Sequence, residues 1–109
     1  MSNELRGHIL VVDDEETNLL VYRKIFTDAG FRVSIARDGQ GTFAKLASDP
    51  PDLILLDIRL QSESGLDILR RIKAEERHSY VYVVMFTANL TASREQAEGL
   101  ELGADGYIT

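Results

Sequence analysis

Leu53-Ile54-Leu55-Leu56-Asp57 is a run of four aliphatic residues that ends in a single carboxylate. A short, uninterrupted apolar run of this kind is typical of a strand buried on both faces, as strands in parallel sheets are. The segment after it, Arg59–Ser64, is mostly polar and indicates a loop. The sequence therefore places Asp57 at the carboxyl end of a strand in the centre of a sheet.

Strand-like apolar runs alternate with helix-like amphipathic segments on both sides of this central strand. The other expected strands are His8–Val12, Phe31–Ala36, Val81–Thr87 and a segment that begins at Gly106. The expected helices are Thr17–Ala29, Gln40–Ser48, a helix that begins at Gly65, and Ala92–Leu102. Strands alternating with helices of this length form βαβ units, whose right-handed crossovers cover both faces of a parallel sheet. We predict an α/β fold with a doubly wound parallel sheet.

Length and composition indicate a single globular domain over residues 1–109. The hydrophobic fraction of 44% is ordinary for a globular protein, and the absence of cysteine excludes disulfides and thiol chemistry. A net charge of −6 argues against direct nucleic-acid binding, because such an interface needs basic residues that neutralise phosphates. The apolar runs fall far short of the roughly 20 residues that span a bilayer, so we expect no membrane contact and a cytoplasmic location.

The carboxyl ends of three expected strands carry distinctive polar residues. Asp13 and Asp14 follow the first strand, Asp57 ends the third, and Thr87-Ala88 stands at the end of the fourth. Open parallel sheets bind their ligands at this edge, so these residues converge on one crevice if the three strands are neighbours. Asp13 and Asp14 also fit a simpler role, as carboxylates that cap the helix after them.

Three carboxylates that meet at one point repel one another. At ~4 Å each pair costs about 1 to 4 kcal/mol, depending on the effective dielectric. Protonation or a divalent cation relieves this repulsion. Oxygen ligands without histidine or cysteine favour Mg²⁺, which keeps several waters and leaves positions for phosphate oxygens. We therefore expect a Mg²⁺ site at this crevice.

The ordered set of these residues resembles the receiver domains of two-component response regulators. The set comprises the acidic pair, Asp57, Gly65 eight residues later and Thr87-Ala88, and Gly99–Thr109 is similar to the family's passage from fourth helix into fifth strand. The resemblance covers residues 8 to 109 and implies a flavodoxin-like sheet with the strand order 2-1-3-4-5. It also implies a phosphorylation-dependent signalling switch that catalyses at most its own phosphorylation and dephosphorylation.

Carried over to this sequence, the resemblance makes Asp57 the nucleophile that takes a phosphoryl group from a histidine kinase or phosphotransfer protein. It implies direct Mg²⁺ ligation by Asp14, Asp57 and the main-chain carbonyl of Arg59, with Asp13 acting mainly through water. His8 and His78, the only two histidines, lie outside the expected crevice, His78 in a polar loop. The phosphoryl group is therefore expected to come from a partner.

The resemblance also assigns residues beyond the carboxylates. The Thr87 hydroxyl and the Ala88 amide are expected to bind phosphoryl oxygens. Tyr107 occupies the family's aromatic switch position, where the ring turns inward when Thr87 moves toward the phosphate. Arg59 and Asn89 are expected to flank the attacking water and to modulate the loss of phosphate.

The sequence departs from the family pattern in two places. The family has a lysine directly after the position of Thr109 and then a last helix, so we expect an incomplete fifth strand, no last helix and a truncated domain. An output domain or downstream protein would then lie outside this chain, and a homodimer through the fourth helix and fifth strand stays open. Gln61 stands where the family often has proline, which predicts a more mobile loop after Asp57.

Two other functions stay open at this point. A receiver-like docking module that is never phosphorylated would explain the absent lysine. A phosphohydrolase of the haloacid-dehalogenase type also uses an aspartate nucleophile and Mg²⁺. Its motif needs a second aspartate two residues after the nucleophile, where this sequence has Arg59 after Asp57 and Glu15 after Asp13.

Overall fold

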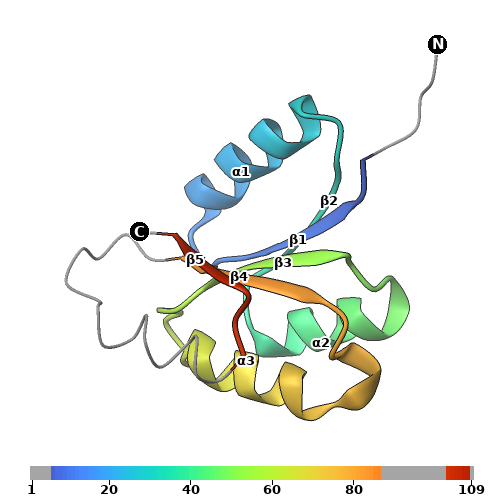
Figure 1. Cartoon of the computed structure of the whole chain (residues 1–109). Helices are drawn as coiled ribbons and strands as arrows, with labels where there is room; N and C mark the ends of the chain where they lie inside the picture. Colours follow the sequence, from blue (N-terminus) through green and yellow to red (C-terminus); the bar gives the residue numbers. More distant parts are fainter. Residues whose placement is uncertain (1–5, 87–102, 109) are drawn as a thin grey trace.

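A computed structural model of the chain describes residues 6–86 and 103–108. Its strands are β1 (His8–Val12), β2 (Arg32–Ala36), β3 (Leu53–Asp57), β4 (Tyr82–Phe86) and β5 (Gly106–Ile108). The helices of the described residues are α1 (Glu16–Asp28), α2 (Gly39–Ser48), α3 (Gly65–Ala74) and a short 3₁₀ helix, η1 (Glu76–His78). Figure 1 shows the strands side by side, with α1 on one face of the sheet and α2 and α3 on the other.

The strands form one parallel sheet in the order β2-β1-β3-β4-β5, which confirms the predicted doubly wound, flavodoxin-like topology. In the register, Val12 lies beside Leu56, and Asp57 lies beside Phe86 of β4. β1 and β3 therefore end level with each other, so the residue after Val12 comes next to Asp57. β5 pairs with β4 over three residues, from Gly106 to Ile108.

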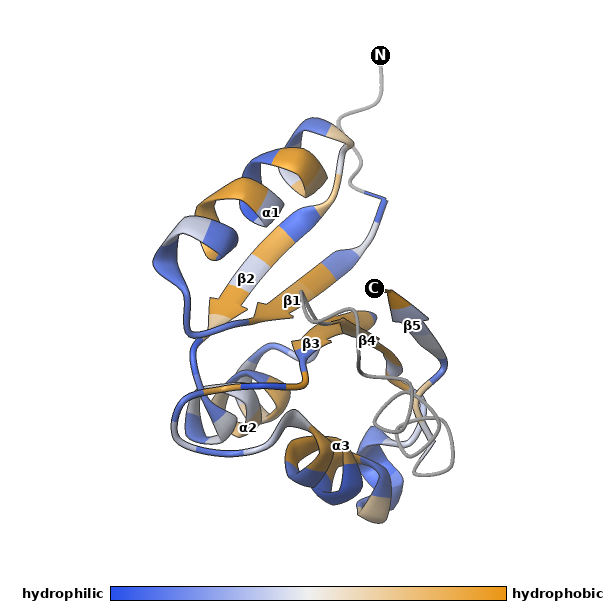
Figure 2. Ribbon diagram, turned by 90° about the vertical axis from the view of Figure 1, so that its left-hand side faces the viewer, coloured by the Kyte–Doolittle hydropathy of each residue, from blue (hydrophilic) through white to orange (hydrophobic). Residues whose placement is uncertain are grey.

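The aliphatic run of β3 packs on both faces, as predicted. On one face Leu56 belongs to a core cluster with Leu46 of α2 and Ile72 of α3. On the other face Leu55 belongs to a cluster with Leu19 of α1. Figure 2 shows the central strands as largely hydrophobic, whereas the helices mix hydrophobic and hydrophilic residues. Burial of one leucine side chain contributes about 2 kcal/mol to the free energy of folding. The two clusters therefore hold the helices against the sheet, and they also fix the positions of the strand ends.

Element boundaries differ slightly from the predicted ones. α1 begins and ends one residue earlier than expected, and β4 begins at Tyr82 because the N–H of Val81 donates to the carbonyl of His78 (3.1 Å). The prediction that His78 lies in a polar loop is wrong, since η1 turns its ring inward and leaves it 6% exposed. The predicted end of the fourth strand at Thr87 and the predicted helix Ala92–Leu102 lie outside the described residues.

Over residues 6–86 and 103–108, no helix has the combination of length and hydrophobicity that crossing a bilayer requires.

Candidate metal and phosphoryl site

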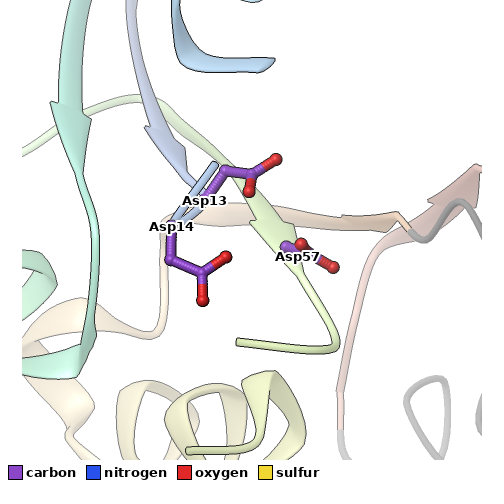
Figure 3. A group of neighbouring side chains, drawn as sticks. All are labelled: Asp13, Asp14 and Asp57. Carbon is purple, nitrogen blue, oxygen red and sulfur yellow. The ribbon is translucent and has the colours of Figure 1, made fainter. Parts of the chain in front are cut away.

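Asp13, Asp14 and Asp57 gather where β1 and β3 end (Figure 3). Each offers a carboxylate oxygen, and these oxygens all lie within 4.8 Å of one another. β1 and β3 are neighbours and end level with each other, so the residues that follow both strands lie at the same edge of the sheet. The predicted convergence of the three carboxylates is therefore confirmed.

Asp13 is fully buried, and its own turn holds it in place. Its N–H donates to the carbonyl of Ala36 (3.1 Å). Its Oδ1 accepts from the N–H of Glu15 (2.9 Å), and its Oδ2 accepts from the side-chain amide of Asn18 (3.0 Å). Asp13 thus also organises the start of α1, where the N-cap residue Glu15 makes no side-chain capping bond. The capping role and the cluster role are therefore compatible.

Asp14 reaches across to the loop between β3 and α3. Its Oδ2 accepts a short hydrogen bond from the main-chain N–H of Gln61, a residue 47 positions later in the sequence. Asp14 is half-buried and Gln61 is exposed, so this bond lies at the surface of the molecule. The bond fixes the carboxylate of Asp14 on the side of the cluster that faces the loop.

Asp57 is half-buried, and its Oδ1 accepts from the N–H of Arg59 (3.0 Å). The pKa of Asp57 is raised to about 6, mainly by burial; the N–H and the charge of Arg59 act against this rise, and the charges of Asp13 and Asp14 add to it. The same carboxylates act on Tyr22 of α1, whose hydroxyl pKa is raised first by burial and then by Asp13 and Asp57. Burial and neighbouring carboxylates therefore both disfavour the charged form of Asp57.

Gly65 allows α3 to begin directly beside Asp57. A Cβ on this residue would lie 2.1 Å from the carbonyl oxygen of Asp57, which no side chain tolerates. The Gly65 N–H donates to the carbonyl of Ile58 (2.7 Å), and the next N–H, that of Leu66, donates to the Oγ of Ser64 (3.1 Å). This close approach, rather than unusual backbone angles, explains why glycine stands here.

The other predicted site residues divide into two groups. Arg59 lies at the start of the β3–α3 loop, where it forms an isolated antiparallel bridge with Ser64. Tyr107 lies in β5, half-buried against the core cluster on the α2 and α3 face. Thr87, Ala88 and Asn89 lie outside the described residues.

Two polar partners of this site were not predicted from the sequence. Asn18 supports Asp13, and Glu63 of the β3–α3 loop accepts from the N–H of Gly39 (2.8 Å). Asn18 lies in the first turns of α1, five positions after Asp13, a spacing that could have indicated the contact. For Glu63 no sequence pattern gives such an indication, because its partner lies 24 positions away on another element.

The donor set fits a hard divalent cation. The three side chains supply only oxygen atoms, they are close enough to share one ion, and Asp57 is destabilised in its charged form. Oxygen ligands, incomplete burial and room for water are the conditions under which Mg²⁺ binds proteins. A cation would relieve the same repulsion that raises the pKa of Asp57.

Known proteins are similar to this chain over nearly its whole length. The family model of the response regulator receiver domain matches residues 9–109. Response regulator PleD of Caulobacter vibrioides is 35% identical over 105 residues, which make up 96% of this chain and 23% of that protein. The phosphate regulon transcriptional regulatory protein PhoB of Pseudomonas aeruginosa is 37% identical over 101 residues, which make up 93% of this chain and 44% of that protein.

A solved structure matches in the same way. The Mn²⁺-bound form of response regulator Rcp1 aligns with a TM-score of 0.85 at 26% identity, covering 94% of this chain and 80% of that one. The chain spans less than half the length of the two curated relatives, so it corresponds to one part of them. With the sheet order, the acidic cluster and these matches in agreement, the chain belongs to the response regulator receiver domain family.

Proposed function

We propose that Asp57 accepts a phosphoryl group from the phosphohistidine of a histidine kinase or phosphotransfer protein, in a Mg²⁺-dependent reaction. Membership of the receiver family implies phosphorylation-dependent signalling, and the acceptor residue and the ion are what we add. The carrying observation is the position of Asp57, whose carboxylate ends a central strand within 4.8 Å of two further carboxylates. We propose no activity beyond phosphorylation and dephosphorylation of the chain itself.

Mg²⁺ would be held by Asp14, Asp57 and the main-chain carbonyl of Arg59, with Asp13 contributing through water. The bound ion supplies charge neutralisation for phosphoryl oxygens. The similar response regulator Rcp1 has been solved in a Mn²⁺-bound form, which supports a divalent ion in the proposal for this chain. The chain's own contribution is to fix the ligands: Asp13 through its local turn, Asp14 through the N–H of Gln61.

In the transfer step, a carboxylate oxygen of Asp57 forms a bond to phosphorus while the bond from phosphorus to the partner's imidazole nitrogen breaks. The electron pair of that bond stays with the imidazole. The N–H of Arg59 holds Oδ1 of Asp57 at 3.0 Å, which orients the carboxylate for in-line attack. The product is an acyl phosphate, which stores enough free energy to bias a two-state surface.

The neighbouring strand supports the rest of the assignment. Phe86, the residue before Thr87, lies beside Asp57 in the sheet register. We therefore assign the Thr87 hydroxyl and the Ala88 amide to the phosphoryl oxygens, since fixed donors at that point stabilise the transferring group. Tyr107, which is packed against the core from β5, is the proposed switch residue.

The signal would pass to an output domain or a downstream protein. A second copy of this chain, forming a homodimer, is a further proposed partner. PhoB is named as a transcriptional regulatory protein and matches over 44% of its length. The expectation of no nucleic-acid contact is therefore confined to these 109 residues and is unsupported for any longer protein. Histidine kinases and phosphotransfer proteins remain the proposed donors.

The test uses acetyl phosphate and, separately, beryllofluoride, each with Mg²⁺. We expect intact-mass measurement to show one added phosphoryl group on the wild-type chain and none on Asp57→Asn. Asp67→Asn is the matched control, because Asp67 lies exposed on α3 and pairs with Arg70 (3.1 Å). Labelling that persists in Asp57→Asn would refute the proposal. Multiple turnover of phosphoesters would favour the hydrolase, and no Asp57-dependent response would favour the docking module.

A further inference from the structure

The β3–α3 loop is fastened to two other parts of the molecule. The N–H of Gln61 donates to Asp14 in the β1–α1 turn, and a carboxylate oxygen of Glu63 accepts from the N–H of Gly39 at 2.8 Å. Within the loop, Arg59 and Ser64 form an isolated antiparallel bridge. The loop that follows Asp57 is therefore fixed at both ends and along its length.

The absence of a side chain at Gly39 leaves room for the carboxylate of Glu63. It is buried, it is the first residue of α2, and a Cβ added to it would lie 2.6 Å from Oε1 of Glu63 and 3.2 Å from Oε2. An N–H in the first turn of a helix lacks an intrahelical acceptor, and the helix start favours negative charge. Glycine therefore lets the carboxylate of Glu63 approach an N–H group that needs it.

Helix α2 already has its own cap. Oδ1 of Asp38, the N-cap residue, accepts from the N–H of Gly41 at 2.7 Å. The carboxylate of Glu63 is thus a second anion at this helix start, and it comes from a loop rather than from the helix's own sequence. Its structural consequence is to anchor the loop to α2.

We propose that Glu63 is a positioning residue for the cation site, an inference that rests on the proposed function. Anchored on Gly39, the loop keeps the N–H of Gln61 on Asp14 and, through the Arg59–Ser64 bridge, the N–H of Arg59 on Asp57. Glu63 touches neither the ion nor the reacting atoms. It acts by holding two carboxylates in the geometry that a divalent cation requires.

Three variants separate anchoring from charge. Glu63→Gln removes the charge but keeps an acceptor for Gly39, Gly39→Ala keeps the charge but displaces the acceptor, and Glu63→Ala removes both. Mg²⁺ affinity is measured by calorimetric titration. Amide hydrogen exchange at Gln61 and Arg59 is measured by NMR in the metal-free protein, so that one readout does not depend on the ion.

We expect Glu63→Gln to bind Mg²⁺ within about twofold of wild type, because one half-exposed charge is strongly screened. Glu63→Ala and Gly39→Ala should bind about tenfold more weakly, the size of effect seen when the outer support of a ligand is lost. Both should also exchange the Gln61 amide faster.

The opposite pattern would overturn the inference. If Glu63→Gln weakens binding as much as Glu63→Ala while Gly39→Ala matches wild type, Glu63 acts through charge and not as an anchor. If all three match wild type in affinity and exchange, the loop needs no anchor. A wild-type chain that binds no Mg²⁺ overturns the proposed function itself, a result distinguishable from either of these.

Discussion

The β1–α1 turn and the β3–α3 loop bring carboxylates to the same point by different means. In the turn, Asp13 is held by Glu15 and Asn18, which are two and five positions away. In the loop, Gln61 contacts Asp14 of the β1–α1 turn, 47 positions away, and Glu63 contacts Gly39 of α2, 24 positions away. Apart from the bond between its N–H and the carbonyl of Ala36, Asp13 is therefore held locally, whereas the loop is held by partners on distant elements.

This difference matters for a site that has to change state. The two hydrogen bonds of the Asp13 carboxylate stay within the turn and the start of α1, so Asp13 depends less on distant elements than the loop does. Contacts between distant elements can open without unfolding the strands that they join. The acidic cluster thus has one side held mainly by local contacts and one side, after the proposed phosphate acceptor, held by contacts between distant elements.

The largest expected effect comes from breaking the loop side at Gly65. Gly65→Ala places a Cβ 2.1 Å from the carbonyl oxygen of Asp57, so the start of α3 must move. We expect a loss of about 3 kcal/mol in the free energy of unfolding, measured by urea denaturation. Gly106→Ala is the control, because its Cβ would meet Val84 at an ordinary contact distance of 3.5 Å. Equal effects of the two substitutions would show that the close approach is not what restricts Gly65.

Breaking the turn side should cost somewhat less. Asp13→Ala leaves the N–H of Glu15 and the amide of Asn18 without their acceptor, at a cost of about 2 kcal/mol in unfolding free energy. It also removes one charge that raises the pKa of Asp57, so that pKa should fall in the variant. Carboxyl carbon NMR across a pH titration measures the second effect. An unchanged Asp57 pKa would mean that the charge of Asp13 does not contribute to it.

Much of this site could be predicted from the sequence, and the reason is geometric. Aliphatic runs marked the strands, the family resemblance implied their order, and the observed order brings Asp13, Asp14 and Asp57 together where β1 and β3 end. The contacts of Gln61 and Glu63 could not be predicted, because they depend on the path of a loop with no periodic pattern. The prediction of a more mobile loop after Asp57 was made without knowledge of these contacts. It stays a prediction.

The next effect is the pH dependence of stability, which arises from Asp57, directly before the β3–α3 loop. Asp57 has a pKa of about 6 in the folded chain and 3.8 as its ordinary value, so between these values the folded form binds more protons than the unfolded form. Without Mg²⁺, stability should therefore fall as the pH rises from about 4 to 6 and level off above. Since Asp57 is half exposed, solvent screening reduces the change to about 1 kcal/mol.

Thermal unfolding of Asp57→Asn across the same pH range checks this expectation. The variant has no carboxylate to ionise at this position, so it should lack the fall and should be more stable than wild type at neutral pH. Saturating Mg²⁺ should raise wild-type stability at neutral pH and leave the variant nearly unaffected. A wild-type profile that rises between pH 4 and 6 without Mg²⁺ would contradict the destabilising role of this carboxylate.

The smallest expected effect lies at Arg59, where the loop leaves Asp57. Its side chain is exposed, so Arg59→Ala should change the free energy of unfolding little. The family resemblance predicts that this side chain and that of Asn89 flank the water that removes the phosphoryl group. We therefore expect Arg59→Ala to change the lifetime of the phosphorylated chain about threefold, which corresponds to ~0.7 kcal/mol in the barrier. Decay of the phosphoprotein by intact mass measures it, with Asn89→Ala run in parallel. If neither substitution alters the decay, the loop acts on this site through its main chain alone, as the N–H groups of Arg59 and Gln61 already do.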